Sequence, residues 1–175
     1  MSTVFVSGPT GCIGAATVGH LLDNGVDEVV GFSRREDFSR IPPQYHDRIR
    51  FIPGDITDAE SVHEAVRQAE PSAIIHLAAY QTPDCQARPM EGLAVNVLGT
   101  ANMFKAAASL GESLRRFVFA SSAAVYGPRS VYTSESVTAD LPYLPPNLYG
   151  CLLYTSPEPT RPRLISYAVF CLKKK

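Results

Sequence analysis

The sequence predicts an α/β fold, a doubly wound parallel sheet with helices on both faces. Short apolar runs alternate with segments whose apolar residues recur at helical spacing. The apolar runs are continuous, as is typical of strands that are covered on both faces. Because parallel crossovers are right-handed almost without exception, the simplest threading has the strand order 3-2-1-4-5.

The elements follow one another at short intervals. The predicted strands are residues 3–8, 28–33, 49–55, 72–79 and 115–122, and the predicted helices are residues 12–25, 58–70 and about 90–109. Thr57 or Asp58 is suited to cap the second helix. From Ser121 to Gly150 the chain is irregular and holds four prolines. A loop of that length in a compact domain is usually functional.

The bulk composition excludes several classes of partner. The hydrophobic fraction is 45%, the charged fraction 19% and the net charge -1, so nothing predicts binding to nucleic acid or to an anionic membrane. No run approaches the roughly 18 apolar residues that a membrane-spanning helix needs. The four cysteines lack metal-type spacing, and no secretory signal is evident. We therefore expect a cytoplasmic protein with free thiols and no metal site.

Three glycines separate the first predicted strand from the first helix. The run GPTGCIG contains Gly8, Gly11 and Gly14, which suit a tight turn, close approach of a diphosphate, and close packing of the helix on the strand. The N–H groups and dipole at the helix start favour negative charge. Three glycines alone are equally typical of a plain corner, but this position favours a nucleotide site. Cys12 is interpreted as a small packing residue.

The end of the second strand, SRRED, indicates which nucleotide binds. An acidic residue there would accept hydrogen bonds from the ribose of NAD, but Ser33 stands there. Arg34 and Arg35 follow, and their guanidinium groups suit a 2′-phosphate. The alternative is a solvated basic pair, with Glu36 and Asp37 close by. We favour NADP over NAD.

Other candidates stand at the ends of the third and fourth strands. In GDITD, Asp55 could reach an adenine amino group, or could cap the following helix instead. The small Ala78 and Ala79 allow a ligand to approach the backbone. His76, inside an apolar strand, is predicted to be a satisfied core histidine. Asn96 is a poor helix former in mid-helix, which a bond to a neighbouring strand or loop would explain.

The motifs together resemble the extended short-chain dehydrogenase/reductase family, also called the NAD-dependent epimerases/dehydratases. GPTGCIG, GDITD, HLAA, NVLGTAN, SSAAVYG and PPNLYG occur in that order between residues 3 and 150. The resemblance implies a Rossmann domain, a homodimer, and a small-molecule substrate that is often a nucleotide-sugar. The nucleotide contacts it implies are Gly8, Gly11, Cys12, Ile13, Gly14, Ser33, Arg34, Asp55, Ile56, Ala78, Ala79 and Asn96.

The same resemblance implies Ser122 and Tyr149 as the catalytic pair. A tyrosine with a reference pKa near 10 needs a nearby positive charge to act as a base, and the family supplies a lysine four residues later. Leu153 stands at that position. Dehydratases of the family carry an acidic pair after the active hydroxyl, where this chain has Ala123 and Ala124. An epimerase or a dehydrogenase/reductase therefore remains, and the alternative is a non-catalytic NADP-binding sensor.

The last 25 residues differ in character from the rest. Residues 1–150 hold eleven basic and sixteen acidic residues, whereas residues 151–175 hold five basic residues and one acidic one. The segments CLLYTSP and ISYAVFCL resemble translations of the two ends of a sequencing-library adapter, and KKK resembles translated poly-A. We therefore expect residues 1–150 to be an incomplete NAD(P)-binding domain, truncated before its later strands and substrate-binding region. We expect residues 151–175 to be a non-native tail and this fragment to be inactive.

Overall fold

The five predicted strands form one parallel sheet in the predicted order. The computed structural model describes residues 2–133 and 136–155. The strands are β1 (Thr3–Ser7), β2 (Glu28–Ser33), β3 (Ile49–Pro53), β4 (Ala73–His76) and β5 (Arg116–Phe119). They are arranged β3-β2-β1-β4-β5, with Val6 opposite Gly31 on one side and Ile75 on the other. The sheet is therefore of the Rossmann type, with β1 at its centre.

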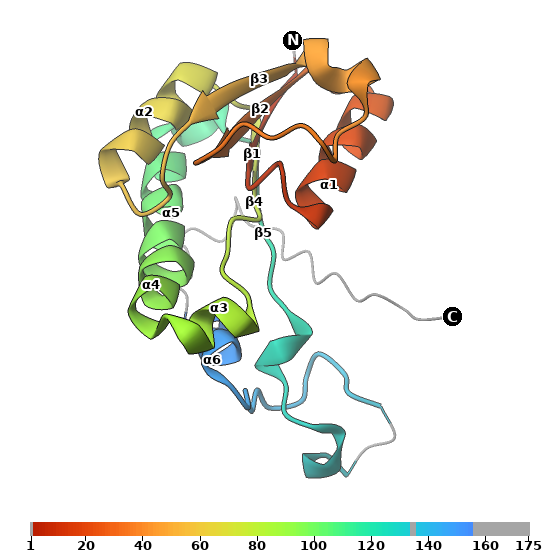
Figure 1. Ribbon diagram of the computed structural model, residues 1–175, viewed down its shortest axis with the longest axis vertical. Coiled ribbons are helices and arrows are strands. Elements are labelled where there is room, and N and C mark those ends of the chain that lie inside the picture. Colours follow the sequence, from red (N-terminus) through yellow and green to blue (C-terminus); the bar gives the residue numbers. More distant parts are fainter. Residues whose placement is uncertain (1, 134–135, 156–175) are drawn as a thin grey trace.

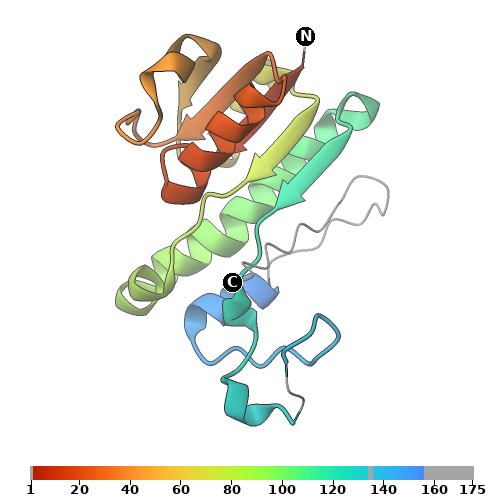
Figure 2. The same cartoon turned by 90° about the vertical axis from the view of Figure 1, so that its right-hand side faces the viewer.

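Helices cover both faces of this sheet. Helix α1 (Cys12–Asp23) lies on one face, and α2 (Ala59–Ala69) and α5 (Gly99–Ser109) lie on the other (Figures 1 and 2). In β1, Val4 and Val6 belong to the cluster under α1, while Phe5 belongs to the cluster under α2 and α5. All three are buried. Burial on both faces explains why the strands are apolar without alternation.

The start of α2 resolves the choice between two caps. The Asp58 carboxylate accepts hydrogen bonds from the backbone N–H groups of Glu60, at 3.0 Å, and Ser61, at 3.1 Å. Asp58 is therefore the N-cap residue, and Thr57 is not. The second reading of Asp55, as a helix cap, is also wrong because the helix begins after Asp58.

The helix predicted from about residue 90 to 109 is present but contains a change of pitch. Helix α4 (Pro89–Leu93) leads into a π-helical segment, η2 (Ala94–Leu98), which continues as α5. The short helix α3 (Thr82–Ala87) precedes them and was not predicted. Such π segments are frequent at functional sites, and this one contains Asn96.

The region after β5 is irregular, as predicted. Its described residues form the 3-10 turns η4 (Ala123–Val125) and η5 (Arg129–Val131) and the helix α6 (Leu148–Thr155). Two further 3-10 turns are η1 (Pro43–Arg48) and η3 (Gly111–Ser113). The buried Tyr132 hydroxyl accepts from the Gly127 N–H at 2.9 Å and donates to the Pro142 carbonyl at 3.0 Å. One side chain thus joins two distant parts of this loop.

Candidate functional site

Two of the three loop glycines are required by the fold itself. Gly8 has φ +72°, a left-handed conformation, and a Cβ there would lie 3.1 Å from the Ala78 nitrogen. A Cβ at Gly14 would lie 2.0 Å from the Gly8 carbonyl oxygen and 2.8 Å from the Pro9 carbonyl carbon. Gly8 therefore makes the turn, and Gly14 lets α1 pack on the loop, as predicted.

Gly11 is different, because the protein leaves room for a side chain there. It has φ -71° and ψ 170°, and a Cβ would meet just the Gly8 carbonyl oxygen, at the ordinary contact distance of 3.6 Å. Gly11 is exposed. Neither backbone conformation nor packing requires glycine at this position. A glycine here leaves the backbone open to the close approach of a ligand that the sequence analysis expects.

The start of α1 offers uncapped N–H donors beside Gly11. Within the described chain, no side chain caps this helix, and its first turn has no acidic residue. Such a terminus suits an anion, so the loop fits the diphosphate of a dinucleotide. Ile13 is 59% exposed here. Cys12 is exposed as well, so the interpretation of Cys12 as a packing residue is wrong.

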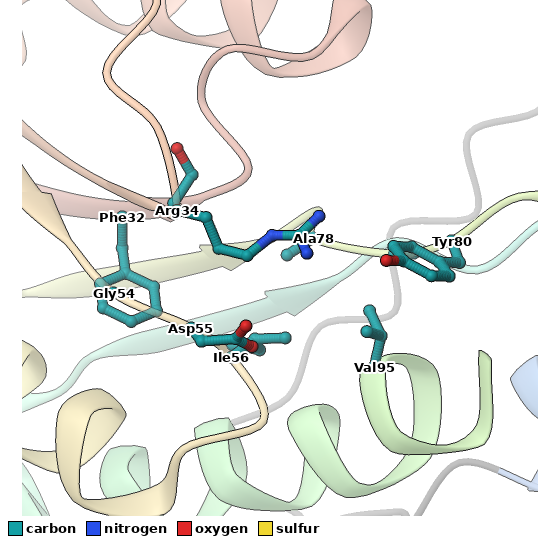
Figure 3. Close-up of a pocket in the computed structure, with 10 residues that line it drawn as sticks. Phe32, Arg34, Gly54, Asp55, Ile56, Ala78, Tyr80 and Val95 are labelled. Carbon is teal, nitrogen blue, oxygen red and sulfur yellow. The ribbon is translucent and has the colours of Figure 1, made fainter. Parts of the chain in front are cut away.

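A pocket of about 170 Å³ opens at the carboxyl ends of β2, β3 and β4 (Figure 3). Ten residues line it: Phe32, Ser33, Arg34, Gly54, Asp55, Ile56, Ala78, Ala79, Tyr80 and Val95. Pockets for whole small molecules occupy roughly 300–1,000 Å³, so this one suits one end of a dinucleotide. It brings together six of the predicted nucleotide contacts from three strand ends. Ligands of open α/β sheets bind in this position.

Asp55 is held as a charged group inside the pocket. Its Oδ1 accepts hydrogen bonds from the Thr57 backbone N–H at 2.9 Å and the Thr57 hydroxyl at 2.8 Å. Burial raises the pKa of Asp55, but these hydrogen bonds and the charge of Arg34 outweigh it and leave the pKa below its usual value. The ionised carboxylate is an acceptor suited to an adenine amino group.

The residues after β2 present positive charge at the pocket. Arg34 lines it, with the guanidinium carbon 5.9 Å from the centre of the Tyr80 ring (Figure 3). The Ser33 hydroxyl donates to the Arg35 carbonyl at 2.9 Å, which ties the turn together. Arg35 is exposed and lies outside the pocket lining. The exposed Asp37 carboxylate accepts from the Ser39 N–H.

Asn96 holds the loop that follows β4. Its Oδ1 accepts from the Tyr80 N–H at 2.7 Å, and its Nδ2 donates to the Tyr80 carbonyl at 2.9 Å. This confirms the predicted bond to a neighbouring loop. Asn96 is 1% exposed, so it supports the pocket from behind.

Sequence reasoning missed four of the ten pocket residues: Phe32, Gly54, Tyr80 and Val95. Tyr80 directly follows the HLAA motif and Val95 directly precedes Asn96. The predicted roles of the residues next to Tyr80 and Val95 were the signal from which these two could have been found. The Arg88 guanidinium carbon also lies over the Tyr80 ring, 4.9 Å from the ring centre. This cation–π contact holds the Tyr80 ring in place at the edge of the pocket.

Ser122 and Tyr149 lie on segments that pack together. The half-buried Ser122 caps η4, and its hydroxyl accepts from the Ala124 N–H at 3.2 Å. Tyr149 stands in the first turn of α6, which the Asn147 side chain caps by accepting from the Gly150 N–H at 3.0 Å. A Cβ at Gly150 would lie 2.1 Å from the Ala124 carbonyl oxygen. The first turn of α6 is thus pressed against η4.

Leu153 is buried on α6, one turn after Tyr149. It is 6% exposed and its neighbour Leu152 is 5% exposed. A leucine here supplies packing and no charge. Helix α6 continues to Thr155, so it runs across the boundary expected after Gly150, and residues 156–175 of the expected tail lie outside the described residues.

A profile of the NAD dependent epimerase/dehydratase family matches residues 4–153. The chain belongs to this family. It is 32% identical to a UDP-glucose 4-epimerase from Erwinia amylovora, over 71% of this chain and 38% of that protein. It is 30% identical to a UDP-glucose 4-epimerase from Bacillus subtilis (strain 168), over 84% of this chain and 43% of that protein. The chain thus spans about two fifths of the length of the curated relatives it matches.

Solved structures of the family are similar in fold and include NAD complexes. The UDP-glucose 4-epimerase of Thermus thermophilus, in complex with NAD, has a TM-score of 0.74 and 28% identity over 86% of this chain and 47% of that one. The Bordetella bronchiseptica enzyme WbmG, in complex with NAD, has a TM-score of 0.72 and 28% identity over 86% of this chain and 46% of that one.

The described residues carry neither a membrane-spanning helix nor a cluster of metal ligands. Among them, no helix is both long and apolar enough to cross a membrane. The same part of the chain holds no group of three or more histidine, cysteine or acidic side chains suited to a metal ion.

Proposed function

We propose that this chain is the cofactor-binding part of an NAD(P)-dependent epimerase or oxidoreductase that acts on a nucleotide-sugar. The observation that carries the proposal is Gly11, a glycine that the fold does not require, at the uncapped start of α1. It stands at the position that the family uses for the diphosphate. The similarity to UDP-glucose 4-epimerases supports the substrate class.

In this proposal the dinucleotide lies along the carboxyl edge of the sheet. The loop of Gly8, Gly11 and Gly14, with Cys12 and Ile13, holds the diphosphate, and Asp55 and Ile56 hold the adenine. Arg34 and Arg35 bind a 2′-phosphate and make NADP the favoured cofactor. The NAD complexes among the related structures make NAD the alternative. Bound there, the nicotinamide supplies hydride transfer.

Ser122 and Tyr149 carry out the proton chemistry. The Ser122 hydroxyl would donate a hydrogen bond to the reacting oxygen of the substrate, and Tyr149, as the phenolate, would take the proton from that oxygen. With Leu153 in place of a lysine, no ammonium group favours the tyrosinate. This chain therefore turns over little or no substrate. A homodimer is the expected assembly of the complete enzyme.

The alternative is a nucleotide-binding sensor in which Leu153 is the native residue. Buried Leu153 is the observation that favours it. Sequencing the source gene across codon 153 distinguishes the two. A lysine codon followed by a longer reading frame supports the enzyme, and a leucine codon supports the sensor.

The enzyme proposal is tested on the protein encoded by that longer reading frame. We expect it to interconvert UDP-glucose and its 4-epimer or to reduce its cofactor in the presence of a nucleotide-sugar. We expect Tyr149→Phe and Ser122→Ala to lower kcat at least a hundredfold. Full activity of both variants would overturn the assignment of the catalytic pair.

A further inference from the structure

Four polar side chains lie in the core of the described chain, and three of them, Ser7, His76 and Thr100, form a hydrogen-bonded series that ends at the backbone carbonyl of Asn96. Ser7 is 0% exposed, and His76, Asn96 and Thr100 are each 1% exposed. They come from β1, β4, η2 and α5. Ser7 Oγ lies 2.6 Å from His76 Nδ1, and His76 Nε2 lies 3.0 Å from Thr100 Oγ1. Burying so many polar groups is costly unless every one is satisfied.

The Ser7 end determines which imidazole nitrogen carries the proton. Ser7 Oγ accepts from the backbone N–H groups of Leu77 and Ala78, each at 3.2 Å. The Leu77 N–H is shared with the Ser7 carbonyl oxygen, at 3.1 Å. Together with the Ala78 N–H it takes the lone pairs of the hydroxyl oxygen, which leaves the hydroxyl hydrogen to donate. His76 Nδ1 is the acceptor within reach, so Nδ1 carries no proton.

The Thr100 end leads to the same answer independently. Thr100 Oγ1 lies 2.8 Å from the Asn96 carbonyl oxygen and donates its one hydrogen there. The hydroxyl oxygen is then free to accept from His76 Nε2–H. Both ends therefore require a neutral imidazole with its proton on Nε2. Burial acts in the same direction and lowers the pKa of His76 to about 4.

Both ends of this series also reach the loop that lines the pocket. Ser7 Oγ holds the Ala78 N–H, and Asn96 holds the N–H and carbonyl of Tyr80. Residues 78–80 contribute to one wall of the pocket (Figure 3). The loop is thus held from behind at both of its ends, while its front faces the pocket.

We propose that Ser7, His76 and Thr100 are positioning residues, which act through Asn96 and the backbone of residues 77–80 to set the shape of the pocket. His76 does so as the Nε2–H tautomer. The proposal rests on the proposed function to the extent that the pocket binds the dinucleotide. The placement of the loop and the tautomer stand without it.

The first test uses the unmutated full chain and needs no ligand. The ¹⁵N chemical shifts of the His76 ring at pH 7 report which nitrogen is protonated. We expect a protonated Nε2 and an unprotonated Nδ1. A proton on Nδ1, or on both nitrogens, overturns the proposal. This measurement decides the question even where a variant fails to fold.

The second test removes and restores one hydroxyl. Thr100→Val keeps the side-chain shape but can neither accept from His76 nor donate to Asn96, whereas Thr100→Ser keeps the hydroxyl. Ser109→Ala is the matched control, because Ser109 is also on α5 and bonds to a carbonyl of its own helix. We expect hydrogen exchange at the Ala78 and Tyr80 amides to be at least tenfold faster in Thr100→Val and unchanged in the other two.

Nucleotide affinity separates this proposal from the function on which it rests. We expect Thr100→Val to weaken NADP or NAD binding at least tenfold and Thr100→Ser to restore it. If the unmutated chain binds a nucleotide and Thr100→Val binds it equally well, the positioning role is wrong. If the unmutated chain binds neither nucleotide, the proposed function fails, and the tautomer and the exchange rates still decide the positioning role.

Discussion

Replacing Gly11 by alanine separates what the fold needs from what the cofactor needs. A Cβ at Gly11 meets one protein atom at 3.6 Å, and φ -71° with ψ 170° is comfortable for alanine. Restriction of the unfolded chain by alanine stabilises a protein by about 0.4–1 kcal/mol, and this gain is opposed because Gly11 is the N-cap residue of α1, where alanine is less favourable than glycine. We therefore expect Gly11→Ala to unfold at about the same urea concentration as the unmutated chain.

The same substitution should damage nucleotide binding. The new methyl group occupies the surface that the diphosphate approaches, so we expect affinity for NADP and NAD to fall at least tenfold, which is about 1.4 kcal/mol. Gly14→Ala is the comparison, because its Cβ would lie 2.0 Å from the Gly8 carbonyl oxygen. Overpacking of this kind costs about 1–3 kcal/mol, so Gly14→Ala should lose stability as well.

Urea denaturation and calorimetric titration of both variants check the reasoning. Unfolding of Gly11→Ala would show that the glycine serves the fold. Undiminished binding by a folded Gly11→Ala would show that no ligand approaches the backbone there. Either result would refute the assignment of the loop.

Three other predictions concern stability. Folded His76 has a pKa of about 4, below the value near 6.5 of the unfolded chain, so below pH 6.5 the unfolded state binds the proton more strongly. The contribution of neutral His76 to the free energy of unfolding should be fully present above pH 6.5 and fall by about 3 kcal/mol as the pH drops to 4. Urea unfolding at pH 6.5 and at pH 4 measures this change. An equal loss in His76→Gln would contradict it. Asp58→Ala should cost about 1 kcal/mol through loss of the α2 cap, whereas Asp58→Asn should recover most of it in the same assay. Tyr132→Phe loses the bonds to Gly127 and Pro142 and should cost about 1–3 kcal/mol; hydrogen exchange at the Gly127 amide should quicken, and unchanged exchange would rule out this role for the hydroxyl.

The sheet could be predicted from the sequence because its signals are local and redundant. Each strand is a short apolar run with turn residues on both sides, and right-handed crossovers leave few ways to connect such runs. The glycine loop was predictable for the same reason. Gly8, Gly11 and Gly14 directly follow the first strand, and their spacing predicts where the chain has no room for a side chain. The structure confirms this steric requirement at Gly8 and Gly14.

Features that depend on distant contacts could not be predicted. Helix α3 has just one buried residue, Cys85, and so shows no helical period in its sequence. The π segment η2 adds a residue to a helical turn, which puts Asn96 inside and leaves Leu98 56% exposed. That shift is invisible to a 3.6-residue period. The backbone of Tyr80 is held at the pocket by hydrogen bonds to the side chain of Asn96, which lies sixteen positions away in the sequence.

Calorimetric titration of NADP and NAD into the full chain tests the central claim most directly. The account predicts that a nucleotide binds, that NADP binds more tightly, and that the double variant Arg34→Ala, Arg35→Ala loses this preference while Arg40→Ala keeps it. Tighter NAD binding that the double variant leaves unchanged would contradict the choice of cofactor. Binding of neither nucleotide to a folded chain would contradict the site itself.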